Sequence, residues 1–138
     1  MNRKEKAIEY FRGSYNCAQS VILAYSDLVG ISEINAKSIA AGFGGGIAQT
    51  KKTCGAITGA IMVIGLKYFN ENKISESKEK TYKISQKFME EFMKKHKSTD
   101  CEELSDEKLN IVGEDGKIIY KDCERYILDV CKILEKYL

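Results

Sequence analysis

Residues 53–66 read TCGAITGAIMVIGL and contain the longest apolar run of the chain, from Ala56 to Leu66. Thr53 is a suitable residue to open a helix, and the run is far shorter than the ~20 residues that a helix needs to cross a bilayer. We therefore expect a buried helix of a globular protein and no membrane span. Small residues recur along it at steps of four, which would let a second helix pack closely: Gly55, Ala56, Gly59 and Ala60.

Helical patterns continue on the N-terminal side of this run. The chain contains no proline, so glycine and capping residues must mark the ends of its helices. A short first helix should end near Gly13. Apolar residues at spacings of three and four predict a second helix from Ala18 to Val29, which Gly30 stops. Ser32 can cap a short third helix that runs through Ile39 to Ala41.

On the C-terminal side, residues 75–96 carry an apolar residue at every fourth position, which predicts an amphipathic helix with a buried stripe: Ile84, Phe88 and Phe92, widened by Met89 and Met93. A last helix has a similar stripe: Cys123, Ile127, Val130, Leu134 and Leu138. Between these helices, residues 109–120 place apolar pairs around a Gly-Glu-Asp-Gly sequence, as in a small hairpin or a structured loop. The sequence thus predicts an all-α fold, with residues 1–138 in a single compact bundle of about five or six helices.

The composition argues against several classes of protein. Hydrophobic residues make up 43% and charged residues 30% of the chain, as in a globular domain. The net charge is +2 and only three of the 22 basic residues are arginine, so we expect no nucleic-acid partner. The N-terminus lacks the apolar stretch of a secretory signal, and we expect the protein in the cytoplasm. In that compartment, five cysteines are poorly explained by structural disulfides.

The glycine-rich residues 42–46 match neither the dinucleotide-binding pattern nor the P-loop pattern. Ile47 stands where the last glycine of GxGxxG belongs, and no predicted strand precedes the segment. We expect a tight turn that brings the backbone close to another helix or to a site at Cys54.

Four of the five cysteines follow a residue that favours the N-cap of a helix, in the pairs Asn16-Cys17, Thr53-Cys54, Asp100-Cys101 and Asp122-Cys123. Gln19 and Glu103 lie three residues after Asn16 and Asp100, where a side chain can complete a capping box. The unpaired amides and the dipole of a helix start stabilise a thiolate, the form of cysteine that attacks disulfides and binds metals. Cys131 lies in the middle of the last helix, and we interpret it as core packing.

Core packing would account for any one of these four cysteines, because cysteine is a small and often buried hydrophobe. It accounts less well for four of them in the same local placement. The separations contain no CxxC pair, and neither a zinc ribbon nor a thioredoxin-like motif fits. His96, the only histidine, lies among lysines and is expected at the surface, which argues against a cysteine-histidine hydrolase.

The cysteines and glycines also follow a known order. Cys54-Gly55-Ala56-Ile57-Thr58-Gly59 reads CGAxxG, an earlier Cys17 precedes an apolar helix, and Cys101 and Cys123 follow at wide spacing. In these features the chain resembles the four-cysteine family known by the motif label C_GCAxxG_C_C, whose members are described as redox-active. The resemblance implies redox chemistry at Cys17, Cys54, Cys101 and Cys123. Cys131 has no counterpart in the motif.

We hypothesise that the four cysteines converge on one site, and two mechanisms stay open. In the first, Cys54, favoured by its helix start and by Lys51 and Lys52, attacks a disulfide of a redox partner protein or of a small thiol compound, and a second cysteine resolves the intermediate. In the second, Cys17, Cys54, Cys101 and Cys123 bind an iron-sulfur cluster or zinc. The non-enzymatic rival is a structural or interaction module whose cysteines pack or hold a structural zinc.

Overall fold

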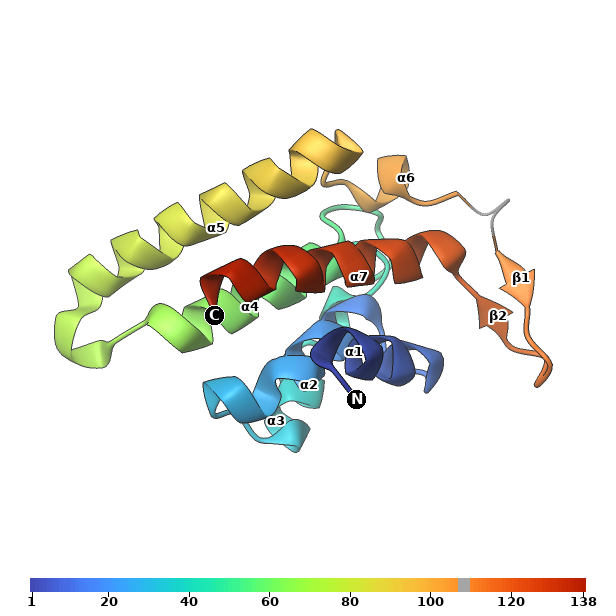
Figure 1. The fold of residues 1–138 in the computed structure, drawn as a ribbon, viewed down its shortest axis with the longest axis horizontal. Helices are drawn as coiled ribbons and strands as arrows, with labels where there is room; N and C mark the ends of the chain where they lie inside the picture. The colour runs from blue at the N-terminus through green and yellow to red at the C-terminus, as the bar shows by residue number, and fades with distance from the viewer. Residues whose placement is uncertain (107–109) are drawn as a thin grey trace.

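The computed structural model describes residues 1–106 and 110–138, and its architecture is helical, as Figure 1 shows. The α-helices are α1 (Arg3–Arg12), α2 (Cys17–Val29), α3 (Glu33–Ile39), α4 (Gly55–Tyr68), α5 (Ile74–His96), α6 (Cys101–Leu104) and α7 (Lys121–Leu134). Short 3-10 turns are η1 (Ala41–Phe43), η2 (Glu71–Lys73) and η4 (Glu135–Tyr137). The all-α prediction is confirmed. The described residues hold seven α-helices where five or six were expected, and the additional α6 is too short to leave a periodic pattern.

Several helix ends follow from local capping. Asn16 and Gln19 form a reciprocal capping box at the start of α2, and Gly30 ends this helix in the left-handed conformation. The Ser32 side chain accepts a hydrogen bond from the Asn35 amide at the start of α3. These three predictions from sequence spacing are confirmed.

Helices α4 and α7 lie at the centre of the molecule. In Figure 1, α5 covers one side of this pair, and α1, α2 and α3 lie on the other. The largest fully buried side chains of the core come from α2, α4, α5 and α7, among them Tyr25, Ile57, Ile64, Phe88, Phe92, Ile127 and Leu134. The buried stripe of α5 is narrower than predicted, because Met93 is exposed to solvent.

Glycine permits the close contact between α2 and α4. A Cβ atom added to Gly59 would lie 2.8 Å from the carbonyl oxygen of Ala18, and one added to Gly55 would lie 2.9 Å from that of Phe43. Both distances are shorter than a normal van der Waals contact. The small residues of α4 therefore serve packing, as their spacing indicated.

Strands β1 (Ile111–Val112) and β2 (Ile118–Ile119) form a small antiparallel hairpin, in which Ile111 pairs with Ile119 and Val112 with Ile118. The hairpin predicted for residues 109–120 is confirmed for its described part, while Leu109 lies outside the described residues. Strand β2 leads directly into α7. In the part of the chain that the structure describes, no helix combines the length and apolarity required to span a membrane.

Candidate functional site

A pocket of about 230 Å³ lies where the starts of α2, α4, α6 and α7 meet. Four cysteines line it, one from each helix start: Cys17, Cys54, Cys101 and Cys123. All five cysteines of the chain are free thiols. Cys131 lies outside the pocket, fully buried in α7, where its carbonyl oxygen accepts a hydrogen bond from the Tyr25 hydroxyl. The structure thus brings four distant cysteines to one pocket and places the fifth in the core.

The cysteines occupy different positions at their helix starts. Cys17 is the first residue of α2, as predicted, and Cys101 is the first residue of α6. Cys54 is itself the N-cap of α4. Cys123 is the third residue of α7, because this helix begins at Lys121 and not after Asp122. Each is therefore close to the unpaired amides of a helix N-terminus, although only one of the four follows a capping side chain.

The capping box predicted for Asp100 and Glu103 is wrong, since the Asp100 side chain makes no capping hydrogen bond. A backbone interaction far along the sequence takes its place. Thr53 and Asp100 form an antiparallel bridge, in which the Cys54 amide donates to the Thr99 carbonyl (2.8 Å) and the Cys101 amide donates to the Lys52 carbonyl (2.7 Å). This bridge ties the start of α4 to the start of α6.

The glycine-rich segment forms a left-handed turn beside the pocket. Every residue from Gly45 to Gln49 has a positive φ angle, and so has Lys51. For residues other than glycine this conformation costs about 1–2 kcal/mol each. Backbone hydrogen bonds hold the turn closed: the amides of Ala48, Gln49, Lys51 and Lys52 donate to the carbonyls of Gly42, Gly44, Gly45 and Gly46, respectively.

The turn packs tightly on a cysteine. A Cβ atom added to Gly46 would lie 2.6 Å from the Cβ of Cys101 and 2.7 Å from the Lys52 amide nitrogen. The close approach expected of residues 42–46 is thus present, and its neighbours are Cys101 and the segment that leads to Cys54.

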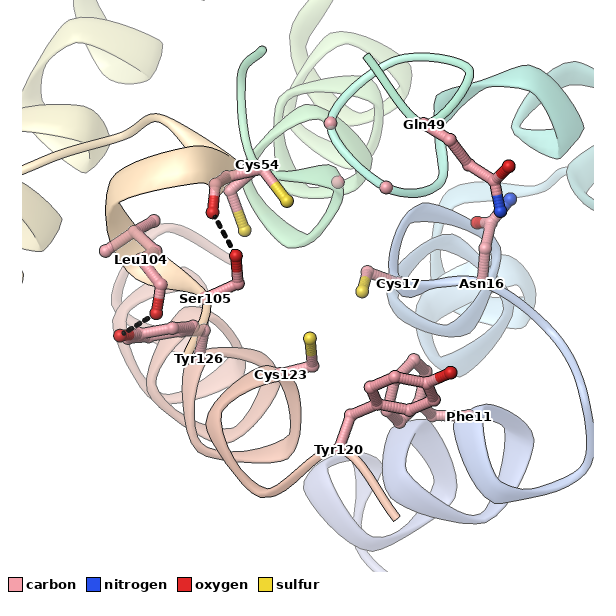
Figure 2. Close-up of a pocket in the computed structure, with 14 residues that line it drawn as sticks. Phe11, Asn16, Cys17, Gln49, Cys54, Leu104, Ser105, Tyr120, Cys123 and Tyr126 are labelled. Carbon is pink, nitrogen blue, oxygen red and sulfur yellow. Dashed lines mark hydrogen bonds between the residues drawn. The ribbon is translucent and has the colours of Figure 1, made fainter. Parts of the chain in front are cut away.

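Cys17 and Cys123 both line the pocket, and Figure 2 shows their sulfur atoms turned toward one another. The interaction with the Cys17 side chain is the main cause that lowers the pKa of Cys123, because it stabilises the thiolate form. The same interaction, together with burial, raises the pKa of Cys17 well above its ordinary value. Cys123 is therefore the more acidic thiol and Cys17 the proton donor.

Cys54 and Cys101 differ from this pair. Burial raises the pKa of Cys54 to about 11, although the amides of Ala56 and Ile57 at the start of α4 oppose the shift. Burial also raises the pKa of Cys101, and Lys51 and the Ser105 hydroxyl counteract it. At Cys54, burial thus outweighs the effect of the helix start, and Lys51 acts on Cys101.

Two of the four cysteines also line a second cavity. This cavity has a volume of about 320 Å³ and is more polar, with Lys51 and Asp122 in its wall beside Cys101 and Cys123. Cys17 and Cys54 do not line it. Cys101 and Cys123 are thus the thiols that can be approached from two sides.

The sulfur donors suit a soft metal ion or an iron-sulfur cluster, which thiolates prefer as ligands. The arrangement of the side chains does not fit such a group as it stands. Within residues 1–106 and 110–138, no group of three or more His, Cys, Asp or Glu side chains is placed to hold a metal ion. Coordination by Cys17, Cys54, Cys101 and Cys123 would require their side chains to converge.

Aromatic side chains that no sequence pattern marked complete the pocket. Phe11 and Tyr120 contact edge to face at one end (6.3 Å between ring centroids), and Tyr126 lies at the other. The Tyr126 hydroxyl donates to the Leu104 carbonyl (2.7 Å), which ties α7 to α6. Local signals miss these residues because their role depends on contacts between distant helices.

His96 is not the surface residue that its lysine neighbours suggested. Its side chain is only 7% exposed, it pairs with Asp129 at 2.7 Å, and its ring packs against Phe92 and Tyr126. It does not line the cysteine pocket. His96 is therefore no partner of a reactive thiol, because it is held elsewhere in the core and not because it faces solvent.

Residues 15–137 match a family model described as "Putative redox-active protein (C_GCAxxG_C_C)". No curated protein and no solved structure matches the chain. The matched range includes all four cysteines of the pocket.

Proposed function

Because this chain belongs to the C_GCAxxG_C_C family, which is described as redox-active, we propose that it transfers electrons by thiol-disulfide exchange at Cys123 and Cys17. The observation that carries the proposal is that the sulfur atoms of these two residues face one another in the pocket. A depressed pKa provides the attacking thiolate at Cys123, and the adjacent Cys17 is positioned to resolve the mixed disulfide.

The exchange runs in two steps. The Cys123 thiolate attacks one sulfur of a substrate disulfide and forms a mixed disulfide, and the other substrate sulfur leaves as a thiolate that takes the Cys17 proton. The Cys17 thiolate then attacks the sulfur of Cys123, and the second substrate sulfur leaves and takes a proton from water. Cys17 and Cys123 are oxidised to one disulfide, while the substrate disulfide is reduced to two thiols.

Cys54 and Cys101 act as a second redox pair in this proposal. They line the same pocket, and the bridge between residues 53 and 100 joins the segments that carry them. Exchange of these two thiols with the Cys17–Cys123 disulfide would form a Cys54–Cys101 disulfide and return Cys123 to its thiolate. Their higher pKa values make them slower to attack but do not prevent this internal step.

The test starts from fully reduced protein that is mixed with a small disulfide under anaerobic conditions. Mass spectrometry of proteolytic fragments should identify the Cys17–Cys123 disulfide as the first product. Cys123→Ser should abolish the reaction, whereas Cys131→Ser should leave its rate unchanged. Four pocket thiols that stay reduced in the native protein would refute the redox function and favour a structural or interaction module.

A second candidate function is electron transfer through a cysteine-ligated iron-sulfur or other redox-active metal centre. The observation that favours it is that four cysteines line the pocket, although two suffice for exchange. Metal and sulfide analysis of anaerobically purified protein, with a visible spectrum, separates the two candidates. Stoichiometric iron with sulfide would overturn the exchange mechanism, colourless zinc would indicate a structural site, and metal-free protein that forms the disulfide supports exchange.

A further inference from the structure

We infer that a groove beside the β1–β2 hairpin binds an extended polypeptide segment and presents its disulfide to Cys123. The inference rests on the exchange function proposed above and adds the class of substrate. The groove has a volume of about 820 Å³ and lies between strand β2, with the turn before it, and the segment that joins α1 to α2. Its volume falls in the ~300–1,000 Å³ range of ligand-binding clefts, whereas the cysteine pocket has only the volume of about eight water molecules.

The groove adjoins the cysteine pocket. Four residues line both of them, namely Phe11, Asn16, Gln49 and Tyr120, and Figure 2 shows the rings of Phe11 and Tyr120 at one end of the pocket. Tyr120 follows β2 in the chain and directly precedes α7, the helix that carries Cys123. A molecule bound along β2 therefore lies next to the opening that leads to the attacking sulfur.

The main chain of β2 suits a peptide ligand. Residues 117–120 line the groove, and across the described residues β2 has β1 as its strand partner and no other. The second edge of β2 can therefore pair with an extended chain, because an open strand edge presents unpaired N–H and C=O groups. A small disulfide without a peptide backbone would not use this edge.

The side chains of the groove point to the same class of ligand. Ile118 is 53% exposed there, beside the rings of Tyr15 and Tyr120. The guanidinium of Arg12 is already held by two hydrogen bonds to the Glu124 carboxylate (3.0 and 2.8 Å). Lys117 stands beside two acidic residues of the turn, Glu114 and Asp115. Two basic and three acidic side chains thus accompany the apolar contacts. This mixture suits a polypeptide, whereas a phosphate group would require an excess of positive charge.

The test compares two disulfides as oxidants of the reduced protein: insulin as a polypeptide probe and hydroxyethyl disulfide as a small probe. Ile118→Asp should slow oxidation by insulin about tenfold, corresponding to the loss of one buried apolar contact, and change oxidation by hydroxyethyl disulfide less than about twofold. Ile118→Lys should behave in the same way, which separates blocking of the groove from a charge effect. Val112→Asp is the matched control, because Val112 is 72% exposed on the same hairpin but does not line the groove.

Each outcome decides a different point. Equal slowing with both probes, or equal slowing by Val112→Asp, would overturn the groove as the polypeptide site. Wild-type protein that reacts with hydroxyethyl disulfide but no faster with insulin would overturn the inference and leave the exchange function intact. Protein that reacts with neither probe would instead refute the exchange function. Circular dichroism and the melting temperature of each variant confirm that it is folded.

Discussion

The sulfur atoms of Cys17 and Cys123 face one another in the pocket, and their interaction makes two identical side chains chemically unequal. The pKa of Cys123 is lowered and that of Cys17 is raised, so that one sulfur is the better nucleophile and the other retains the proton. Both residues lie in the first turn of their helix. The difference between their pKa values therefore arises from the contact between α2 and α7 and not from their positions within the helices.

Cys17→Ala should therefore raise the pKa of Cys123 toward its ordinary value of 9.0. Without the donor, the thiolate loses its main stabilisation, and the reaction of Cys123 with iodoacetamide should require a higher pH. The pH dependence of alkylation, followed by mass spectrometry of the Cys123 peptide, measures the shift. Cys17→Ser is the control, since its hydroxyl preserves a donor and should preserve most of the effect. An unchanged midpoint in Cys17→Ala would contradict the pairing.

Two glycines of α4 should respond in opposite ways to alanine. Gly59→Ala places a methyl group 2.8 Å from the Ala18 carbonyl and should destabilise the protein by about 1–3 kcal/mol. Gly65→Ala meets no atom within 4 Å and should stabilise it by about 0.5–1 kcal/mol through helix propensity. Denaturant unfolding of both variants provides the comparison, and equal effects would argue against close packing of α2 on α4.

A second comparison of two glycine substitutions tests the packing of the left-handed turn on Cys101. Gly46 has a positive φ of 71°, and a Cβ added there would lie 2.6 Å from the Cβ of Cys101. Gly46→Ala should therefore lower the free energy of unfolding and also change the alkylation rate of Cys101. Gly116 has a positive φ of 79°, but a Cβ added there would meet no atom within 4 Å. Gly116→Ala should therefore lower the free energy of unfolding only through backbone strain, by about 1–2 kcal/mol. If both variants lose the same stability, the turn does not press on Cys101.

Arg12 connects the end of α1 to the start of α7 through its two hydrogen bonds to Glu124. Arg12→Met should lower the free energy of unfolding by about 1–2 kcal/mol. This value is near the lower limit for charged hydrogen bonds, because the Arg12 side chain is 55% exposed and solvent weakens its interactions. Arg125→Met is the comparison, since its Asp122 contact of 3.5 Å is exposed on the arginine side and should contribute about 0.5 kcal/mol or less. Thermal and denaturant unfolding measure both effects.

The ion pair of Arg3 with Asp27 predicts a pH dependence of stability. Hydrogen bonds from Arg3 lower the pKa of Asp27 to about 2, below its ordinary value of 3.8. The stabilisation from this pair should therefore be complete above about pH 4 and should decline as the pH falls through 2. The difference in melting temperature between wild type and Arg3→Met should shrink over that range. In an Asp27→Asn background, Arg3→Met should show no such dependence.

Local signals predicted much of the fold. The capping box of Asn16 and Gln19 and the left-handed Gly30 depend on residues within a few positions of one another, and the sequence contains them all. The same reasoning failed at Asp100, whose backbone bridges to Thr53 instead of opening a helix with a capping side chain. Such a bridge joins distant segments and leaves no mark on the spacing of either.

The chemistry of the cysteines was less accessible than their placement. For Cys54, the helix start and two adjacent lysines were visible in the sequence, but the extent of burial was not. For Cys123, the decisive neighbour is Cys17, which reaches it only through the packed helices. Sequence patterns could therefore identify the four cysteines as candidate site residues, whereas the order of their pKa values depends on tertiary contacts.

The left-handed turn at residues 45–49 also constrains how this sequence can vary. Four of its backbone hydrogen bonds connect fixed pairs of residues between Gly42 and Lys52, and the Lys52 carbonyl in turn accepts a hydrogen bond from the Cys101 amide. One inserted or deleted residue would put every pair out of register and turn the Lys52 carbonyl away from α6. The segment is therefore a spacer of fixed length, whose residue count is constrained by its hydrogen bonds as its composition is constrained by the close contact at Gly46.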